Sequence, residues 1–493
     1  MTTREPGVEG RPGAPAIDEL NRRRRIGILL ICSMSLLIVG LDVTIVNVAL
    51  PSIGRDLDAS VSGLQWTVDA YTLVLASLLM LSGSTADRLG RRRTFVIGLS
   101  VFSCGSLLCS LAPGIGLLVV FRMVQAVGGS MLNPVAMSII TNTFTDPRER
   151  AQAVGVWGAV VGVSMALGPA LGGLLVSAAG WRAVFWINLP VGLAAIVLTL
   201  WFIPESKAPR ARRFDPGGQV LMIVLFASLT YGIIEAPRQG LGSPVIVLAF
   251  AAAAAALAGI LLYEPRRQDP LVDIRFFRSI PFSAATATAV AAFAAFGGFL
   301  FLNTLYLQVV RGLSPLRAGL DTLPMAVMTM VASPISGRIV GTRGPRLPLV
   351  ISGAALTVAS TTLAFVDPST PFPWLFAAYV VFGIGFGLVN APITNAAISG
   401  MPRAQAGVAS AIASTSRQVG ATLGVAVAGA LLTSQIHGSV HAGLSAASHG
   451  AWWVLAACGV AVLVLGVAGT SGRARASARD VAVELNPEVL PAG

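Results

Sequence analysis

The chain has 493 residues, of which 55% are hydrophobic and only 11% are charged, and its formal net charge at pH 7 is +12. A soluble protein has a charged fraction of about 25%, so this composition excludes a soluble enzyme and indicates a polytopic membrane protein. The arginines lie in short loops between apolar runs, which is typical of membrane topology and argues against a nucleic-acid-binding surface.

Apolar runs account for most of the chain. A tail rich in proline, glycine and charge comes first, and we expect it to be disordered. Fourteen runs long enough to cross a bilayer follow, so we expect an all-α fold with fourteen transmembrane helices. These runs are 26–50, 64–84, 94–112, 115–141, 151–177, 183–203, 217–236, 243–263, 281–306, 317–340, 347–366, 373–397, 405–433 and 450–470.

The loops predict the orientation. Basic residues gather on the side of the N-terminus, for example in Arg22–Arg25 and Arg91–Arg93. Since cytoplasmic loops carry an excess of arginine and lysine, both termini are expected in the cytoplasm. The opposite loops hold only Arg55, Arg182, Arg238, Arg311 and Arg317.

The second half of the chain repeats the first. Arg150-Ala-Gln-Ala returns at Arg403, and Asn133-Pro134 is matched by Asn390-Ala-Pro392, at offsets of about 253–258 residues. The ninth run therefore corresponds to the first. This correspondence predicts two six-helix bundles joined by two linking helices. Parallel repeats of this kind are typical of secondary transporters, whose site lies between the halves. The expected parts are a cytoplasmic tail (1–25), the first bundle (26–203), the linking helices and loops (204–280), the second bundle (281–470) and a second cytoplasmic tail (471–493).

The first run contains an ionisable residue, Asp42, and a carboxamide, Asn47. A charge at this depth costs at least ~2.5–3.5 kcal/mol on insertion scales. Arg122 in the fourth run is its expected partner, because both residues lie about eight positions from the outer ends of antiparallel helices. Two interpretations stay open: Asp42 takes up and releases a proton as water reaches it, or the pair is a permanent structural ion pair.

The loop after the second run reads Gly83-Ser-Thr-Ala-Asp87-Arg88-Leu-Gly90-Arg91-Arg92-Arg93. Its glycines allow the backbone a tight turn. Asp87 can cap the next helix or pair with an arginine, and the arginines suit the phospholipid headgroups. In the second-half copy Gly341 stands where Asp87 aligns.

The fifth run combines a proline with small residues: Gly155, Ser164, Gly168, Pro169, Gly172 and Gly173. Proline removes a helix hydrogen bond, and small residues let another helix pack against the resulting bend.

Together these motifs resemble the major facilitator superfamily, and within it the fourteen-span drug:proton antiporter branch. The loop matches the superfamily pattern Gly-x-x-x-Asp-Arg-x-Gly-Arg-Arg, and the fifth run resembles the antiporter signature of drug exporters, with Ser164 where a glycine is usual. Three further segments complete the resemblance, which covers about residues 26–470: Gly180-Trp181-Arg182, Ile187–Pro190 and Arg417–Gly420. The resemblance implies that Gly83, Asp87, Arg88, Gly90, Arg91 and Arg92 latch and release a cytoplasmic gate.

Three other acids lie in apolar runs, namely Asp69, Glu235 and Asp321. In related exporters such acids help to bind cationic drugs or carry protons. The alternative is a hydrated outer vestibule, which we favour for Glu235 because Pro237 ends the helix just beyond it. The candidates for lining a transport cavity are Asn47, Gln125, Asn133, Asn303, Asn390 and Arg417.

No sequence feature indicates an enzyme. The only lysine is Lys207, so there is no Walker phosphate loop, and no histidine lies in an apolar run. We therefore expect no metal and no cofactor other than protons as the coupling ion. The predicted function is proton-coupled antiport that exports hydrophobic or amphipathic drugs or antibiotics by alternating access across a bacterial plasma membrane. The expected transporter is a monomer in the lipid bilayer that binds a small molecule and no nucleic acid. The alternative is a facilitator that moves an endogenous metabolite or lipid-like molecule.

Overall fold

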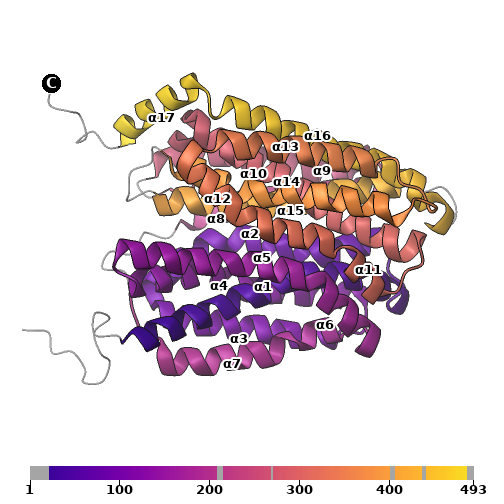
Figure 1. The fold of residues 1–493 in the computed structure, drawn as a ribbon, viewed down its shortest axis with the longest axis horizontal. Helices are drawn as coiled ribbons and strands as arrows, with labels where there is room; N and C mark the ends of the chain where they lie inside the picture. Colours follow the sequence, from indigo (N-terminus) through magenta and orange to yellow (C-terminus); the bar gives the residue numbers. More distant parts are fainter. Residues whose placement is uncertain (1–20, 208–214, 268–269, 400–405, 436–439, 486–493) are drawn as a thin grey trace, which may run out of the picture.

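The computed structural model describes residues 21–207, 215–267, 270–399, 406–435 and 440–485. Long helices that run roughly side by side dominate this part of the chain, as Figure 1 shows, so the all-α expectation is confirmed. The described chain begins and ends at the same end of the bundle, which we call the terminal end (Figure 1). The cytoplasmic placement of that end stays a prediction.

The first half packs around α1 and α4. α1 contacts α4, α5 and α7, while α4 also contacts α2 and α3. α3 in turn packs on α7, while large apolar side chains such as Leu193 and Trp201 stay exposed on the outer surface of this half. The helices of this half are α1 (Arg22–Asp56), α2 (Val61–Leu89), α3 (Arg91–Ser110), α4 (Ile115–Thr143), α5 (Pro147–Ala179), α6 (Ala183–Trp186) and α7 (Asn188–Phe202).

The second half repeats these contacts. α10 packs on α14, α15 and α16, α14 also packs on α12 and α13, and α13 packs on α16. α10 ends in a π-helical turn, η4, which matters for the pocket described below. The helices are α10 (Ile280–Leu305), η4 (Tyr306–Val310), α11 (Pro315–Asp321), α12 (Leu323–Arg343), α13 (Arg346–Leu363), α14 (Phe372–Ile398), α15 (Ala406–Gln435) and α16 (Val440–Ala468).

One pair of close contacts shows how the repeat is preserved in three dimensions. A Cβ atom on Gly168 of α5 would lie 2.7 Å from Thr44 Cβ of α1. In the second half, a Cβ atom on Gly297 of α10 would lie 3.1 Å from Ala421 Cα of α15. Each of these pairs therefore needs a glycine, and the two contacts occupy corresponding places on the equivalent helix pairs α1–α5 and α10–α15.

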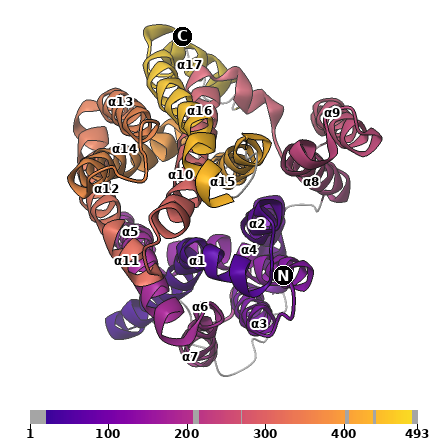
Figure 2. The same cartoon turned by 90° about the vertical axis from the view of Figure 1, so that its right-hand side faces the viewer.

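A helical hairpin lies beside the two halves, where Figure 2 shows α8 and α9 apart from α12 and α13. Its inner helix, α8, contacts α2 and α15. Gln219 Nε2 donates to Ser77 O at 2.5 Å near one end of α8, and Trp66 Nε1 donates to Glu235 Oε1 at 3.0 Å near the other. The remaining elements are α8 (Pro216–Gln239), α9 (Pro244–Tyr263), η2 (Glu264–Arg266), η3 (Ile274–Arg278) and α17 (Gly472–Leu485).

The two halves meet along α2 with α15, and along α5 with α11 and α12. Gln65 Nε2 donates to Ala426 O at 2.9 Å, and Thr422 Oγ1 donates to Thr72 Oγ1 at 2.7 Å. A Cβ atom on Gly319 of α11 would lie 2.8 Å from the carbonyl carbon of Pro169. These contacts lie from the middle of the helices toward the end opposite the terminal end, so the halves are closed there.

The number of membrane-spanning helices corrects the sequence prediction. Within the described residues, twelve helices are long and apolar enough to cross a membrane, so the expectation of fourteen is wrong. The predicted runs 151–177 and 405–433 lie on α5 and α15, and neither helix belongs to the twelve. Among the described residues, α5 contributes the apolar segment Leu167–Ala179, while α15 carries polar residues, Arg417 among them, in its interior. α15 lies where the halves meet, so small and polar residues take the place of some of the long apolar side chains that face lipid.

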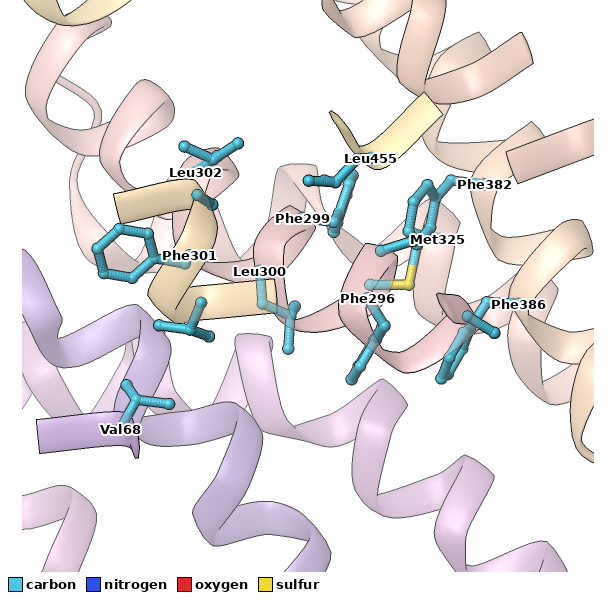
Figure 3. Close-up of a cluster of buried hydrophobic side chains, with 14 of the residues drawn as sticks. Val68, Phe296, Phe299, Leu300, Phe301, Leu302, Met325, Phe382, Phe386 and Leu455 are labelled. Atoms are coloured by element: carbon cyan, nitrogen blue, oxygen red, sulfur yellow. The ribbon is translucent and has the colours of Figure 1, made fainter. Parts of the chain in front are cut away.

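The core of the second half is aromatic (Figure 3). Phe296 of α10 stacks on Phe386 of α14 with ring centroids 4.2 Å apart, and Phe299 stacks on Phe382 at the same distance. Trp452 of α16 meets Phe299 edge-on at 6.0 Å. These contacts hold α10, α14 and α16 together without any charged group. The centre of the first half instead holds charged and polar side chains.

Candidate transport site

An ion pair lies at the centre of the first half. Arg122 Nη1 of α4 donates to Asp42 Oδ2 of α1 at 2.5 Å, so the structure brings together the two residues that the sequence predicted to pair. Each residue is 1% exposed. Breaking a buried pair by removing one partner typically costs about 3–5 kcal/mol, since the other charge is left uncompensated.

Three further polar side chains surround the carboxylate. Gln125 Nε2 donates to Asp42 Oδ1 at 2.8 Å, and Asn188 Nδ2 of α7 donates to the same oxygen at 3.2 Å. Ser106 Oγ of α3 accepts from both carboxamides, at 2.7 Å and 2.8 Å. Gln125 was predicted only as a cavity residue. Asn188 and Ser106 were not predicted, although Asn188 belongs to the Ile187–Pro190 segment that contributed to the resemblance.

The guanidinium is held on its other side by α2. Arg122 Nε donates to Thr67 O at 3.2 Å, and the guanidinium carbon lies 4.1 Å from the centroid of the Tyr71 ring. Such a cation–π contact contributes about 2 kcal/mol when it is desolvated. Five helices, α1, α2, α3, α4 and α7, therefore converge on one charge pair.

The chemistry of this cluster follows from its hydrogen bonds. Both oxygens of Asp42 accept from side-chain donors, which suits the deprotonated carboxylate. Because Asp42 is buried, a proton cannot reach it from solvent in this conformation. Proton exchange at Asp42 therefore requires a second conformation in which water enters between the helices.

The small residues of α5 let this helix pack on α1 of its own half and on α11 of the other half. Ser164 lies against Gly40 of α1, and Gly172 faces the backbone of Ile45. On the other side, a Cβ atom on Gly173 would lie 2.7 Å from Leu316 Cα of α11. Pro169 lies inside α5, as does Gly155. The small residues thus let α5 contact the helix of Asp42 and the opposite half at once.

The predicted gating loop forms a tight turn between α2 and α3. Gly90 has φ = +110°, a conformation that favours glycine, and Asp87 pairs with Arg91 at 3.2 Å. Gly83 and the exposed Arg88 lie near the end of α2.

An unpredicted residue, Glu205, binds the start of α3. Its carboxylate accepts from the backbone N–H groups of Arg92 and Arg93 at 3.1 Å and 3.3 Å. A carboxylate is favourable at a helix N-terminus, where the backbone N–H groups are unsatisfied. Glu205 therefore ties the loop to the segment that follows α7.

Comparison with known proteins identifies the family. Residues 32–425 match the Major Facilitator Superfamily. The chain belongs to the major facilitator superfamily. The family predicted from the motifs is confirmed, so the chain is a transporter and not an enzyme. Its apolar helices and its bacterial relatives, Mycobacterium tuberculosis and Streptomyces glaucescens among their sources, make it a multi-pass protein of a bacterial plasma membrane.

Curated relatives are named for drug resistance. The chain is 36% identical to the multidrug resistance protein Stp of Mycobacterium tuberculosis, over 84% of this chain and 76% of the relative. It is 39% identical to the tetracenomycin C resistance and export protein of Streptomyces glaucescens, over 83% of this chain and 76% of the relative. It is also 36% identical to a methylenomycin A resistance protein of Streptomyces coelicolor, over 80% of this chain and 83% of the relative.

Solved structures share the fold at low sequence identity. A D-xylose–proton symporter superposes with a TM-score of 0.64 at 15% identity, covering 89% of this chain and 97% of the symporter. A bacterial homologue of the human lysosomal transporter Spinster, in an inward-facing and unoccupied conformation, superposes with a TM-score of 0.63 at 19% identity, covering 96% of this chain and 100% of that one. The likeness shows the facilitator fold.

The other predicted acids of this transporter lie in three different environments. Asp69 is fully buried in α2, and within the described residues neither of its carboxylate oxygens has a hydrogen-bond partner. Asp321 pairs with Arg317 at 2.9 Å. Glu235 is 8% exposed and accepts from Trp66, so it joins α8 to α2 and does not lie in an open vestibule.

The six cavity candidates separate into three groups. Asn47 and Asn303 line one pocket between the halves. Gln125 belongs to the Asp42 cluster. Asn133, Asn390 and Arg417 do not line that pocket, and Arg417 Nη2 instead donates to Thr394 Oγ1 at 2.6 Å.

Proposed function

We propose that this member of the major facilitator superfamily is a proton-coupled antiporter. It exports hydrophobic or amphipathic drugs or antibiotics across the plasma membrane by alternating access. The observation that carries the proposal is the buried Asp42–Arg122 pair. Ionisable residues inside membrane helices are costly and usually functional. The names of the relatives, which refer to multidrug resistance and to tetracenomycin C export, support drugs as the substrate class.

The position of the pair relative to the contacts between helices supports coupling. Asp42 lies two residues from Thr44, which packs on Gly168 of α5, and α5 packs on α11 of the other half. Protonation of Asp42 removes its charge and its attraction to Arg122, so the hydrogen bonds that join α1, α4 and α7 rearrange. A change at Asp42 therefore reaches the contact between the halves through α1 and α5.

The proposed cycle has two steps. In the outward-facing state water reaches Asp42, Asp42 takes up a proton, and drug affinity falls. In the inward-facing state Asp42 releases the proton and drug enters from the cytoplasm or the inner leaflet. In the conformation described here Asp42 is buried, which would prevent a proton leak between these states.

The experiment uses the full chain in proteoliposomes with an imposed pH gradient. We expect Asp42→Asn to abolish gradient-driven drug export and drug-dependent proton flux while the protein still inserts and folds. Asp58→Asn is the matched control, because Asp58 is exposed just beyond α1 and its φ of 47° suits asparagine equally well. Intact coupled export by Asp42→Asn would remove Asp42 from the mechanism. Substrate movement without proton flux in the wild type would favour the facilitator alternative.

A further inference from the structure

A small pocket lies between the two halves, and two of the residues that line it, Thr44 and Asn47, follow Asp42 on α1. Helices α1 and α5 of the first half and α10, η4, α11 and the turn before α12 of the second half form its wall. The six polar side chains that face it are Thr44, Asn47, Asn303, Thr304, Gln308 and Thr322. Among the residues that the structure describes, no acidic or basic one lines this pocket.

Three of these side chains are carboxamides, and each is bonded to the protein through one of its two polar atoms. Asn47 Nδ2 donates to Val43 O at 2.7 Å, and Gln308 Nε2 donates to Val48 O at 2.8 Å. Asn303 Oδ1 accepts from the hydroxyl of Tyr379. Since a backbone carbonyl can only accept, these bonds leave the oxygen of Asn47 and of Gln308 as the second polar atom of each carboxamide.

The second polar atom of each carboxamide has no partner among the described residues. Asn47 Oδ1 and Gln308 Oε1 are unpaired acceptors, and Asn303 Nδ2 is an unpaired donor. The three residues are only 3%, 5% and 1% exposed, respectively. A buried polar atom without a partner costs about 1–3 kcal/mol. Three of them around one pocket mark a place where a bound polar group can supply the missing hydrogen bonds.

The backbone at the end of α10 sets the position of Gln308. Gln308 lies in the π-helical turn η4, which ends α10. From this turn Gln308 reaches across to the backbone of α1, so the pocket is held together by a hydrogen bond between the halves. A ligand here contacts both halves and the helix that carries Asp42.

Because it offers acceptors and a donor but no charge, the pocket suits a particular chemical class. We propose that it is a substrate subsite that binds an uncharged hydrogen-bonding group, such as a hydroxyl, a ketone or a carboxamide, of the exported molecule. This inference rests on the proposed function. A site built from buried polar groups rejects a molecule that cannot pair with them, because those groups are then left unsatisfied.

The test measures equilibrium binding of two probes to the purified full-length protein. Tetracenomycin C is a neutral molecule with hydroxyl and carbonyl groups, and tetraphenylphosphonium is a cation without hydrogen-bonding groups. The test variant is Gln308→Leu. Its matched control is Gln219→Leu, because Gln219 is also buried, also donates through Nε2 to a backbone oxygen, and also has an unpaired Oε1, but it lies on α8 away from the pocket.

We expect Gln308→Leu to weaken tetracenomycin C binding about tenfold, which corresponds to about 1.4 kcal/mol. Tetraphenylphosphonium binding should change less than about twofold, and Gln219→Leu should affect neither probe by more than this. Asn303→Leu is a second test variant with the same expected selectivity. Equal losses for both probes, no loss for either, or a wild type that does not bind tetracenomycin C would overturn the subsite. Export of tetraphenylphosphonium by the wild type, driven by a pH gradient, tests the proposed function separately.

Discussion

Gln125 bridges the two members of the buried ion pair. Its Oε1 accepts from Arg122 Nη1 at 2.7 Å, while its Nε2 donates to Asp42 Oδ1 at 2.8 Å. One neutral side chain therefore contacts both the cation and the anion, and it belongs to the same helix as Arg122. Any change in the charge of Asp42 must change the hydrogen bonds of Gln125.

The first prediction concerns this bridge. Gln125→Leu removes two hydrogen bonds to charged groups, each of which contributes about 1.5–3 kcal/mol. We expect drug-dependent proton flux in proteoliposomes to fall at least about tenfold. Wild-type flux in this variant would show that the bridge is dispensable. Gln239→Leu, at the end of α8, is the control and should keep wild-type flux.

The second prediction concerns the guanidinium. Arg122→Ala should abolish coupled export, since Asp42 would lose its cation. Arg122→Lys should recover only part of it, because a single ammonium group cannot reproduce the separate bonds of Nε to Thr67 O and of Nη1 to Asp42 and Gln125. The rate of pH-gradient-driven export is the measurement. Full rescue by lysine would contradict a role for the guanidinium geometry.

The third prediction tests the packing of α5. A Cβ atom on Gly168 would lie 1.8 Å from Thr44 Oγ1, so Gly168→Ala should force α1 and α5 apart and lower the apparent Tm by several degrees. Gly116→Ala in α4 is the control, because no atom lies within 4 Å of its added Cβ, and alanine is the better helix former. The two variants should therefore shift the Tm in opposite directions, and equal Tm values would contradict the proposed packing.

The fourth prediction concerns Glu205. Glu205→Ala leaves the N–H groups at the start of α3 without their carboxylate, which contributes about 0.3–1 kcal/mol at an exposed helix end. Amide hydrogen exchange of residues 91–94 should become severalfold faster. Glu484→Ala removes an acid that pairs with Arg278 instead and should leave this exchange unchanged. Unchanged exchange in Glu205→Ala would show that the loop does not depend on the carboxylate.

Much of the architecture could be predicted from the sequence, because hydrophobic length and helix geometry determine it. The depth of Asp42 and Arg122 in antiparallel helices was sufficient to pair them. The count of apolar runs was wrong for α15, which it included as an apolar membrane-spanning helix. A helix buried between the two halves has no need to be apolar on all sides. Hydropathy alone cannot distinguish a face that meets protein from a face that meets lipid.

The neutral members of the site were harder to predict. Ser106 and Asn188 are uncharged residues in apolar runs. The bond of Asn188 to Asp42, and the bonds that Ser106 accepts from Gln125 and Asn188, depend on how α3 and α7 are rotated. Gln308, which donates to Val48 O, lies in the π-helical turn that ends α10, and the sequence does not indicate this turn. Charges are conspicuous in a membrane sequence, whereas carboxamides and hydroxyls acquire their roles from packing.

The most direct test of the central claim is the number of protons released when drug binds. Calorimetric titration of the purified protein with tetracenomycin C, repeated in buffers of different ionisation enthalpy, gives this number. In the proposed cycle drug binds when Asp42 has lost its proton, so we expect binding to release up to about one proton from the wild type and none from Asp42→Asn. Equal proton release by the two proteins would contradict the account.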